Sequence, residues 1–198
     1  MVEHFNMCKK SKVKIKDLGR SYSVMNMSKE DLTEAGNSCI IYGELFTTYD
    51  CVATNIVSCT PKAVHSSTVS TGYDLLFPAS TTVDAQSLIA PTAVSQPDII
   101  LGGDMFGIAV KREYNNEYLS YILNFVYKKY LAQYAQGSTI IHLHYNDIKK
   151  MDIYLPNKDT QDKLATLLKN MQDKVFIEKK MLSMLKTKKA YFLRNMFI

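Results

Sequence analysis

Long apolar runs are missing from this chain of 198 residues. No window approaches the ~20 consecutive apolar residues that a membrane-spanning helix requires, and the N-terminal MVEHFNMCKK has no apolar stretch behind its charges. These absences argue against a membrane span and against a secretory leader. We therefore expect a soluble, cytoplasmic protein whose length suits one domain with an appended element.

Cysteine pairs at metal-binding or redox spacing are also missing. The four cysteines, Cys8, Cys39, Cys51 and Cys59, show no C-x-x-C pattern, and nothing in the sequence indicates an oxidising compartment. We therefore predict that they are reduced and structural.

The motifs on which common catalytic sites are built are absent as well. There is no P-loop and no G-x-S-x-G nucleophile elbow, and Gly102, Gly103 and Gly107 are spaced wrongly for a G-x-G-x-x-G phosphate loop. His142 and His144 alternate on an expected strand and so point the same way, but a third metal ligand at suitable spacing is missing. The sequence therefore predicts neither a catalytic centre nor a metal site.

Charge is unevenly distributed along the chain. The net charge of +5 favours an anionic partner. However, residues 1–157 carry 14 Lys and Arg against 15 Asp and Glu, a net charge of −1, whereas residues 158–198 carry 10 against 4, a net charge of +6. Bulk charge alone therefore does not mark the larger part as a nucleic-acid-binding domain.

The first part of the chain is typical of a β-rich domain. Short apolar or β-branched runs are separated by Asn, Ser, Thr, Gly and Pro, which favour turns. We predict strands at residues 13–18, 38–43, 51–59, 73–77, 98–101 and 107–112.

An amphipathic helix is predicted over residues 115–135, ending before Gly137. Its apolar stripe consists of Leu119, Ile122, Leu123, Val126, Tyr130 and Tyr134. A strand over 138–145, a helical turn at 146–151 with Asn146 as N-cap, and a last strand over 152–156 complete the prediction. Together these elements form an α+β domain that we assign to residues 1–157.

Residues 158–198 are predicted to form a long helix, because Asp159 is a candidate cap and no Gly or Pro follows Pro156. A heptad register places Leu168, Val175, Leu182 and Lys189 at position a, and Leu164, Met171, Glu178, Leu185 and Phe192 at position d. A helix over about 159–194 is roughly 50 Å long at 1.5 Å per residue, which is more than the domain can bury. We therefore expect the helix to pair with a second copy; the alternative is an apolar face that folds back on its own domain.

Basic residues and polar loops favour binding over catalysis. Between residues 9 and 20 lie Lys9, Lys10, Lys12, Lys14, Lys16 and Arg20, and Lys111-Arg112 follows a predicted strand. The loops TTYD, ASTTVDAQS and QGSTIIH separate apolar runs. Lys and Arg bind phosphates, whereas Ser, Thr, Gln, Asn and Tyr also offer hydrogen bonds to base edges. The alternative interpretation is ordinary polar surface.

Five segments follow one another in a recognisable order. The first, GNSCIIYGELFTTY, contains Gly36, Ile40, Ile41, Tyr42, Gly43, Glu44, Leu45, Phe46 and Thr47. The second segment is GYDLLFPASTTVDAQSLIAP, in which Tyr73 stands between Gly72 and Asp74. The third is DIILGGDMFGIAV. The last two are NNEYLSYILNFVYKKYLAQYAQGSTIIHLHYNDIKKMDIYLP and Gln161, which is spaced from Pro156 as P-x-x-x-x-Q. From about Val13 to Phe197, these segments resemble the target-recognition domain and long helix of type I restriction-modification specificity subunits.

The resemblance implies a function and partners. Full-length specificity subunits carry two recognition domains and two long helices that pack as an antiparallel coiled coil. This chain has one of each, so it resembles a half-length subunit that pairs with a second copy. Such subunits do no chemistry: they read double-stranded DNA and recruit adenine-N6 methyltransferase (modification) subunits and restriction subunits. S-adenosylmethionine, ATP and Mg are therefore expected in the partners and not in this chain.

The matched loops supply the candidate DNA contacts, which are Lys14, Tyr42, Thr47, Tyr49, Ser80, Thr81, Thr82, Lys111, Arg112, Gln136, Ser138 and Thr139. The helix seam supplies the candidate dimer contacts, which are Leu164, Leu168, Met171, Val175, Leu182 and Leu185. The basic outer face of the helix, with Lys174, Lys179, Lys180, Lys186 and Lys188, either meets DNA or a partner subunit or is simply solvated. Two rival functions share this pattern: a DNA-binding protein outside a type I system, and a dimeric scaffold without DNA affinity.

Overall fold

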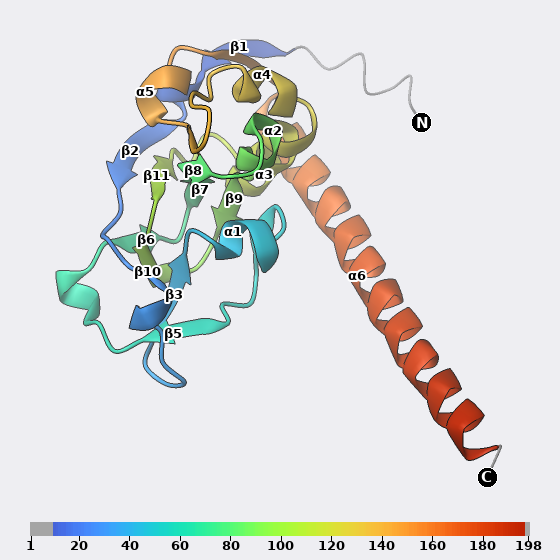
Figure 1. Ribbon diagram of the computed structural model, residues 1–198. Coiled ribbons are helices and arrows are strands. Elements are labelled where there is room, and N and C mark those ends of the chain that lie inside the picture. Colours follow the sequence, from blue (N-terminus) through green and yellow to red (C-terminus); the bar gives the residue numbers. More distant parts are fainter. Residues whose placement is uncertain (1–9, 197–198) are drawn as a thin grey trace. The chain divides into compact units, whose positions relative to one another are not determined.

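The computed structural model describes residues 10–196 of the chain (Figure 1). Of the residues discussed above, Cys8, Lys9 and Phe197 lie outside this range. The chain divides into two compact units, Met1–Asp162 and Lys163–Ile198. The α+β class predicted from the sequence is confirmed.

Short strands and helices alternate through the first unit. The strands are Ser11–Lys14 (β1), Gly19–Ser23 (β2), Asn37–Ile41 (β3), Val52–Ala53 (β4), Ser58–Thr60 (β5), Val69–Thr71 (β6), Asp74–Pro78 (β7), Ser80–Thr81 (β8), Thr92–Val94 (β9), Pro97–Gly102 (β10), Met105–Val110 (β11), Ile141–His142 (β12) and Asp152–Leu155 (β13). The helices are Glu44–Thr47 (α1), Ala85–Leu88 (α2), Asn116–Phe125 (α3), Lys128–Ala132 (α4), Tyr145–Ile148 (α5) and Lys158–Asn195 (α6). Single 3-10 turns lie at Ile15–Asp17, Lys29–Asp31 and Val64–Ser66.

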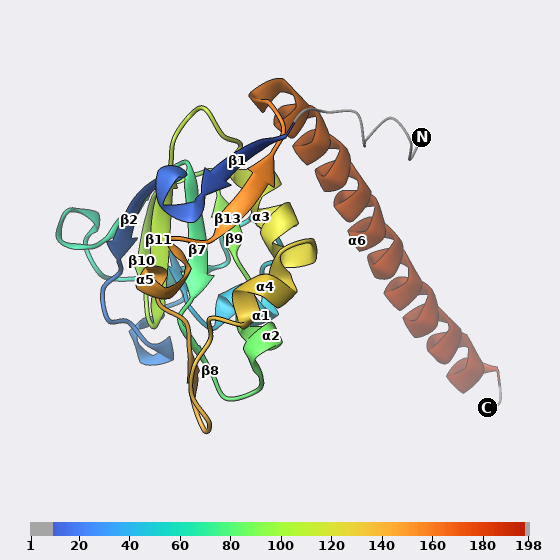
Figure 2. The ribbon, with the colours of Figure 1, turned by 90° about the horizontal axis from the view of Figure 1, so that it is seen from above.

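Two mixed sheets form the centre of the first unit (Figures 1 and 2). One has the strand order β2-β11-β7-β9-β4 and the other the order β5-β3-β10-β6. The chain passes from β10 in the second sheet to β11 in the first through Gly103 and Asp104, and Gly103 has φ 97°. This backbone conformation suits glycine, so the turn that joins the sheets depends on it.

Both faces of the second sheet are covered by core residues. Successive side chains of a strand point to opposite faces, so neighbouring residues of β3 and β10 belong to different clusters. One core cluster contains Ile40, Leu76, Leu101 and Met105, and the other contains Met27, Cys39, Ile41 and Ile100. Among the described cysteines, Cys39, Cys51 and Cys59 are free thiols. Burial raises the pKa of Cys39 to about 12 and that of Cys51 to about 11, so both stay neutral at pH 7.

The strand prediction over residues 51–59 was wrong, because this run divides between the two sheets. Val52–Ala53 pairs in parallel with β9, whereas Ser58–Thr60 pairs antiparallel with β3. The sequence shows a continuous apolar pattern here, and only the tertiary partners separate the two strands. The last predicted strand is present as β13, and it pairs antiparallel with β1.

The helix predicted over residues 115–135 is in fact two helices, α3 and α4. Polar side chains on α3 donate hydrogen bonds to backbone carbonyl groups at the sheet edge. Asn116 Nδ2 donates to the carbonyls of Asp74 and Val94, both at 3.3 Å. The Ser120 hydroxyl donates to the Cys51 carbonyl and Asn124 Nδ2 to the Pro91 carbonyl, both at 2.6 Å. These bonds fix α3, and the chain then turns at residues 126–127.

The turn corrects the predicted apolar stripe. Leu119, Ile122 and Leu123 are buried as expected, but Val126, Tyr130 and Tyr134 are 61%, 57% and 37% exposed. Leu131 is fully buried in their place, because α4 starts a new helical phase.

The segment after α4 also departs from the prediction. Only Ile141–His142 of the strand expected over 138–145 pairs with another strand. His144, and not Asn146, is the N-cap of α5, and the Asp147 carboxylate accepts a hydrogen bond from the His144 backbone N–H at 3.1 Å. The N-cap of the short helix therefore lies two residues earlier than its side-chain pattern indicates.

The first turn of α6 belongs to the first unit and is fixed by hydrogen bonds. Asn157, not Asp159, provides the cap, since its Oδ1 accepts from the Thr160 N–H at 3.0 Å. Buried Gln161 accepts from the Asn115 N–H at 3.0 Å and donates to the Pro156 carbonyl at 2.8 Å.

Asp162 completes this junction. It pairs with Lys158 and accepts from Asn115 Nδ2 at 2.7 Å. The ion pair with Lys158 and, to a smaller extent, the hydrogen bond from Asn115 hold the pKa of the Asp162 carboxyl below its usual range.

Within residues 10–196, no helix is both long and apolar enough for a membrane crossing.

A buried carboxylate organises the start of β7. Asp74 is fully buried; its Oδ1 accepts from the Tyr22 hydroxyl at 2.9 Å, and its Oδ2 accepts from the backbone N–H groups of Thr71 at 2.6 Å and Tyr73 at 3.2 Å. Burial and the nearby Asp74 charge raise the pKa of Tyr22, so the phenol remains a donor.

Replacing Asp74 should therefore destabilise the domain. We expect Asp74→Ala to lower the free energy of unfolding by roughly 2–4 kcal/mol, because several partly buried donors lose their acceptor. Urea denaturation measures the change, with Glu34→Ala as an exposed acidic control expected to stay within about 0.5 kcal/mol of the wild type. Equal stability of the two variants would contradict the assigned role.

Candidate nucleic-acid interface

A groove of about 740 Å³ collects several of the predicted DNA contacts. We call it the recognition groove. Its lining comes from residues 26–29, 41–44, 46–47, 80–82 and 103–104 and from Ile140. It therefore brings together five of the candidate residues, Tyr42, Thr47, Ser80, Thr81 and Thr82, from segments far apart in the sequence.

The turn from β3 into α1 forms the floor of the recognition groove. Glu44 holds this turn, since its carboxylate accepts from the Ile41 N–H at 2.9 Å and from the Ser58 hydroxyl at 2.5 Å. The Tyr42 N–H donates to the Gly102 carbonyl at 3.1 Å. A Cβ on Gly103 would lie 2.8 Å from Cδ1 of Tyr42, so the ring packs directly over this glycine. Tyr42 is therefore held in place at the surface.

A hairpin forms one wall of the recognition groove. β12 pairs with β8, and Gln136 and His142 exchange backbone hydrogen bonds of 2.9 and 2.7 Å. Ser138 and Thr139 lie exposed at its tip. Figure 2 shows this segment, near the label β8, extending away from the strands. Three more candidates, Gln136, Ser138 and Thr139, therefore belong to the hairpin that contributes Ile140 to the groove, although they do not line it themselves.

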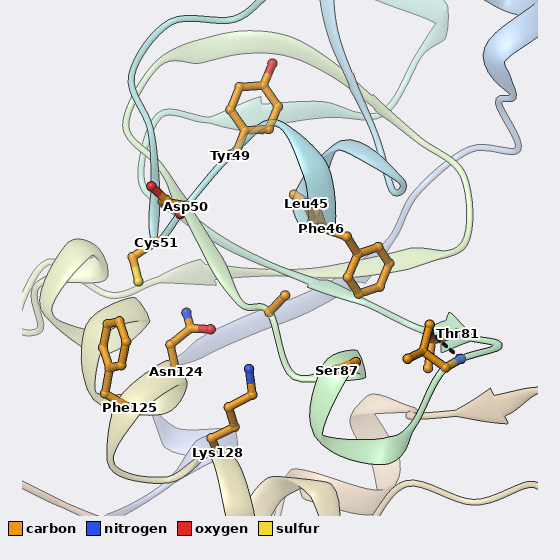
Figure 3. Close-up of a pocket in the computed structure, with 12 residues that line it drawn as sticks. Leu45, Phe46, Tyr49, Asp50, Cys51, Thr81, Ser87, Asn124, Phe125 and Lys128 are labelled. Atoms are coloured by element: carbon orange, nitrogen blue, oxygen red, sulfur yellow. Dashed lines mark hydrogen bonds between the residues drawn. The ribbon is translucent and has the colours of Figure 1, made fainter. Parts of the chain in front are cut away.

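A second pocket of about 500 Å³ adjoins the recognition groove and shares Phe46 and Thr81 with it. Figure 3 shows Asn124, Phe125 and Lys128 on its other side. Sequence analysis missed these three residues, which lie on either side of the break between α3 and α4.

Tyr49 contributes to the same pocket as a packing residue. Its side chain is buried, and its hydroxyl accepts from the Val57 N–H at 3.2 Å. Burial raises the pKa of Tyr49 to about 12.

The remaining basic candidates lie outside the recognition groove. Asp104 precedes β11 and lines the groove, whereas Lys111 and Arg112 follow the other end of this strand. The strand separates them by about 20 Å at ~3.3 Å per residue. The Arg112 guanidinium lies 4.1 Å from the centre of the Tyr73 ring, and Lys111 is 3.9 Å from Glu113. Lys14 pairs with Asp152 at 3.3 Å on the β1–β13 ribbon.

His142 and His144 face each other. Their rings stack with centroids 5.9 Å apart and planes 9° apart. In the part of the chain that the structure describes, no cluster of three or more His, Cys, Asp or Glu side chains is placed to hold a metal ion.

The candidate dimer residues lie along α6. Met171, Val175, Leu182 and Leu185 are exposed, and Leu164 and Leu168 are partly exposed. Lys174 pairs with Glu178 along the helix at 4.0 Å. Ile177, Met184 and Tyr191 are also exposed. They follow one another at intervals of seven residues and lie on a different face of α6 from the candidate dimer residues.

The chain matches a known family along most of its length. Residues 8–187 match the family model of the type I restriction modification DNA specificity domain. The chain therefore belongs to this family, as its sequence motifs predicted. No curated protein matches the chain closely enough to count as a relative.

Solved structures share the fold. The type I restriction-modification S subunit from M. genitalium is 14% identical with a TM-score of 0.66, and the match covers 97% of this chain and 46% of that one. The HsdS subunit from Thermoanaerobacter tengcongensis is 12% identical with a TM-score of 0.58, covering 87% and 39%. A chain from a type I R-M system studied for complex assembly and conformational transition is 13% identical with a TM-score of 0.63, covering 90% and 42%. This chain thus spans less than half the length of each.

The hairpin wall depends on Gly137, which has φ 129° and whose added Cβ would lie 2.0 Å from the Ile140 carbonyl oxygen. We expect Gly137→Ala to open the hairpin, so that the amide protons of Gln136 and His142 exchange with solvent at least about tenfold faster. Hydrogen exchange followed by NMR measures this. Gly43→Ala is the matched control, because its added Cβ meets nothing within 4 Å; unchanged exchange in Gly137→Ala would show that the hairpin does not need glycine there.

Proposed function

We propose that this chain is a non-catalytic DNA sequence-recognition subunit of a type I restriction-modification enzyme. The observation that carries the proposal is the coincidence of the family match with the recognition groove. The groove gathers aromatic and hydroxyl side chains from loops, the usual carriers of base-edge contacts.

The side chains of the recognition groove suit duplex DNA. Within residues 10–196, the hydroxyls of Tyr42, Ser80 and Thr82 make no hydrogen bond to the protein, so they are free to bind base edges. Lys29 lines the groove and Lys128 lies in the adjoining pocket, where both can reach phosphates. Tyr49 is buried, and Lys14, Lys111 and Arg112 do not line the groove, so we assign none of them to base reading.

We propose that α6 forms the dimer and sets the spacing between two recognition domains. Residues 158–198 would then be a functional segment distinct from residues 1–157. Its 38 residues span about 57 Å at 1.5 Å per residue. An antiparallel pair of such helices would place two recognition domains in two-fold symmetry, and the pair would read inverted, identical half-sites. Methylation and cleavage would be carried out by modification and restriction subunits that hold their own S-adenosylmethionine, ATP and Mg.

Methylation mapping tests DNA recognition. Cells that express the chain with its modification subunit should acquire a new two-part, symmetric motif with methylated adenine, absent from cells with that subunit alone. Removing the free hydroxyls with Ser80→Ala and Thr82→Val should abolish or change the motif. Ser38→Ala with Thr68→Val, outside the recognition groove, should leave it intact. A stable complex that produces no motif would favour the scaffold function.

Solution mass tests the dimer. Leu168→Glu with Leu182→Glu should give monomers, because each buried leucine contributes roughly 1.5–3 kcal/mol and charge replaces apolar contact. Ile177→Glu with Met184→Glu is the matched control, since these residues lie on another face of α6 and should leave the dimer unchanged. Light scattering measures the mass; a dimer that survives the first pair but not the second would transfer the interface to the other face.

A further inference from the structure

Three exposed apolar side chains line the recognition groove without contributing to the core. Tyr42 is 36% exposed, Phe46 37% and Ile140 49%. They come from the β3–α1 turn, α1 and the hairpin, respectively. Large apolar side chains gathered in one concave surface mark a contact site.

The aromatic pair is held rigidly. Tyr42 packs over Gly103, and Phe46 meets the Tyr42 ring edge-on, with centroids 6.5 Å apart and planes at 87°. Phe46 also lies where the recognition groove joins the second pocket. A fixed aromatic edge is suited to a small apolar group of the ligand, because little side-chain freedom is lost on contact.

Ile140 is contributed to the same lining by another segment of the chain. Its backbone lies in the hairpin closed by the Gln136–His142 hydrogen bonds and shaped by Gly137. Ser80 and Thr82 lie beside it in the same lining. The lining of the recognition groove therefore combines apolar groups with free hydroxyls.

This combination matches the major-groove edge of one base in particular. Thymine presents a C5-methyl group beside its O4 acceptor, whereas guanine is read mainly by paired donors from Arg or Lys. Among the described residues that line the recognition groove, there is no arginine, and Lys29 is the one lysine. An apolar protein partner would leave the hydroxyls of Tyr42, Ser80 and Thr82 unpaired on contact.

We propose that Phe46 and Ile140 contact the C5-methyl group of a thymine, so that the recognition groove reads an A·T base pair in each half-site by its methyl group. The inference rests on the proposed DNA-recognition function and adds the identity of one base and the side chains that select it.

The experiment removes the methyl group alone. The full chain, in complex with its modification subunit, is bound to a duplex that carries the motif found by methylation mapping, and each thymine is replaced singly by deoxyuridine. At one thymine per half-site, we expect the Kd of the wild-type complex to rise about fourfold, the size expected for one methyl group leaving an apolar contact.

Variants connect that loss to the two side chains. Ile140→Ala and Phe46→Ala should bind the thymine and deoxyuridine duplexes equally, whereas Val57→Ala, exposed and outside the recognition groove, should keep the fourfold preference. Ile140 lies in an exposed hairpin, so its variant decides the question even if Phe46→Ala does not fold.

The outcomes separate the inference from the proposed function. Sequence-specific binding with no deoxyuridine effect, or with an effect that both variants retain, overturns the methyl contact but leaves DNA recognition in place. Loss of the modification subunit from Ile140→Ala would assign the apolar residues to a protein contact and overturn it too. A wild-type complex with no sequence-specific binding overturns both.

Discussion

The polar contact between α3 and the edge of the first sheet is the constraint on which the rest of the structure depends. Asn116, Ser120 and Asn124 follow one another at four-residue intervals and reach carbonyl groups of β7, β9 and the neighbouring loops. Apolar packing tolerates sliding, whereas side-chain amides aimed at particular carbonyls do not. One end of α3 meets the first turn of α6 through Asn115 and Gln161, and its other end reaches the pocket beside the recognition groove. A single short helix therefore links the first turn of α6 to the pocket beside the groove.

Several turns line the recognition groove together with α1 and β8, whereas the core clusters consist mainly of strand residues. Tyr42 depends on Gly103, and Ile140 depends on Gly137, but neither glycine lies within a strand or helix. The core residues Ile40 and Leu101 lie on the same strands that lead into these turns. Core and groove thus have different physical requirements: the first needs close packing, the second needs backbone conformations that hold a few side chains outside it. The exposed side chains of the groove, such as Tyr42, Phe46 and Ile140, lie outside both core clusters.

The sequence was sufficient for features that depend on local pattern. The buried strands β7, β10 and β11 and the long helix α6 follow from apolar runs and from the absence of Gly and Pro. Five of the groove residues, Tyr42, Thr47, Ser80, Thr81 and Thr82, were found because they occupy polar segments between or beside those strands. The break at residues 126–127 was not predictable, because it results from carbonyl groups distant in sequence that bind Ser120 and Asn124. Lys128 was missed for the same reason, and the burial of Tyr49 depends on a partner, Val57, in the following loop.

The β1–β13 ribbon has a consequence for how such proteins change. Ser11 is paired with Leu155 and Lys14 with Asp152, so the chain enters and leaves the domain at adjacent points. The residues between β1 and β13 therefore start and finish at the same place, because the two strands are hydrogen-bonded to each other. Domains with neighbouring ends tolerate exchange and insertion, because replacing the interior moves neither end. A different segment between β1 and β13 would therefore enter and leave at the same ribbon, and the start of α6 would keep its place.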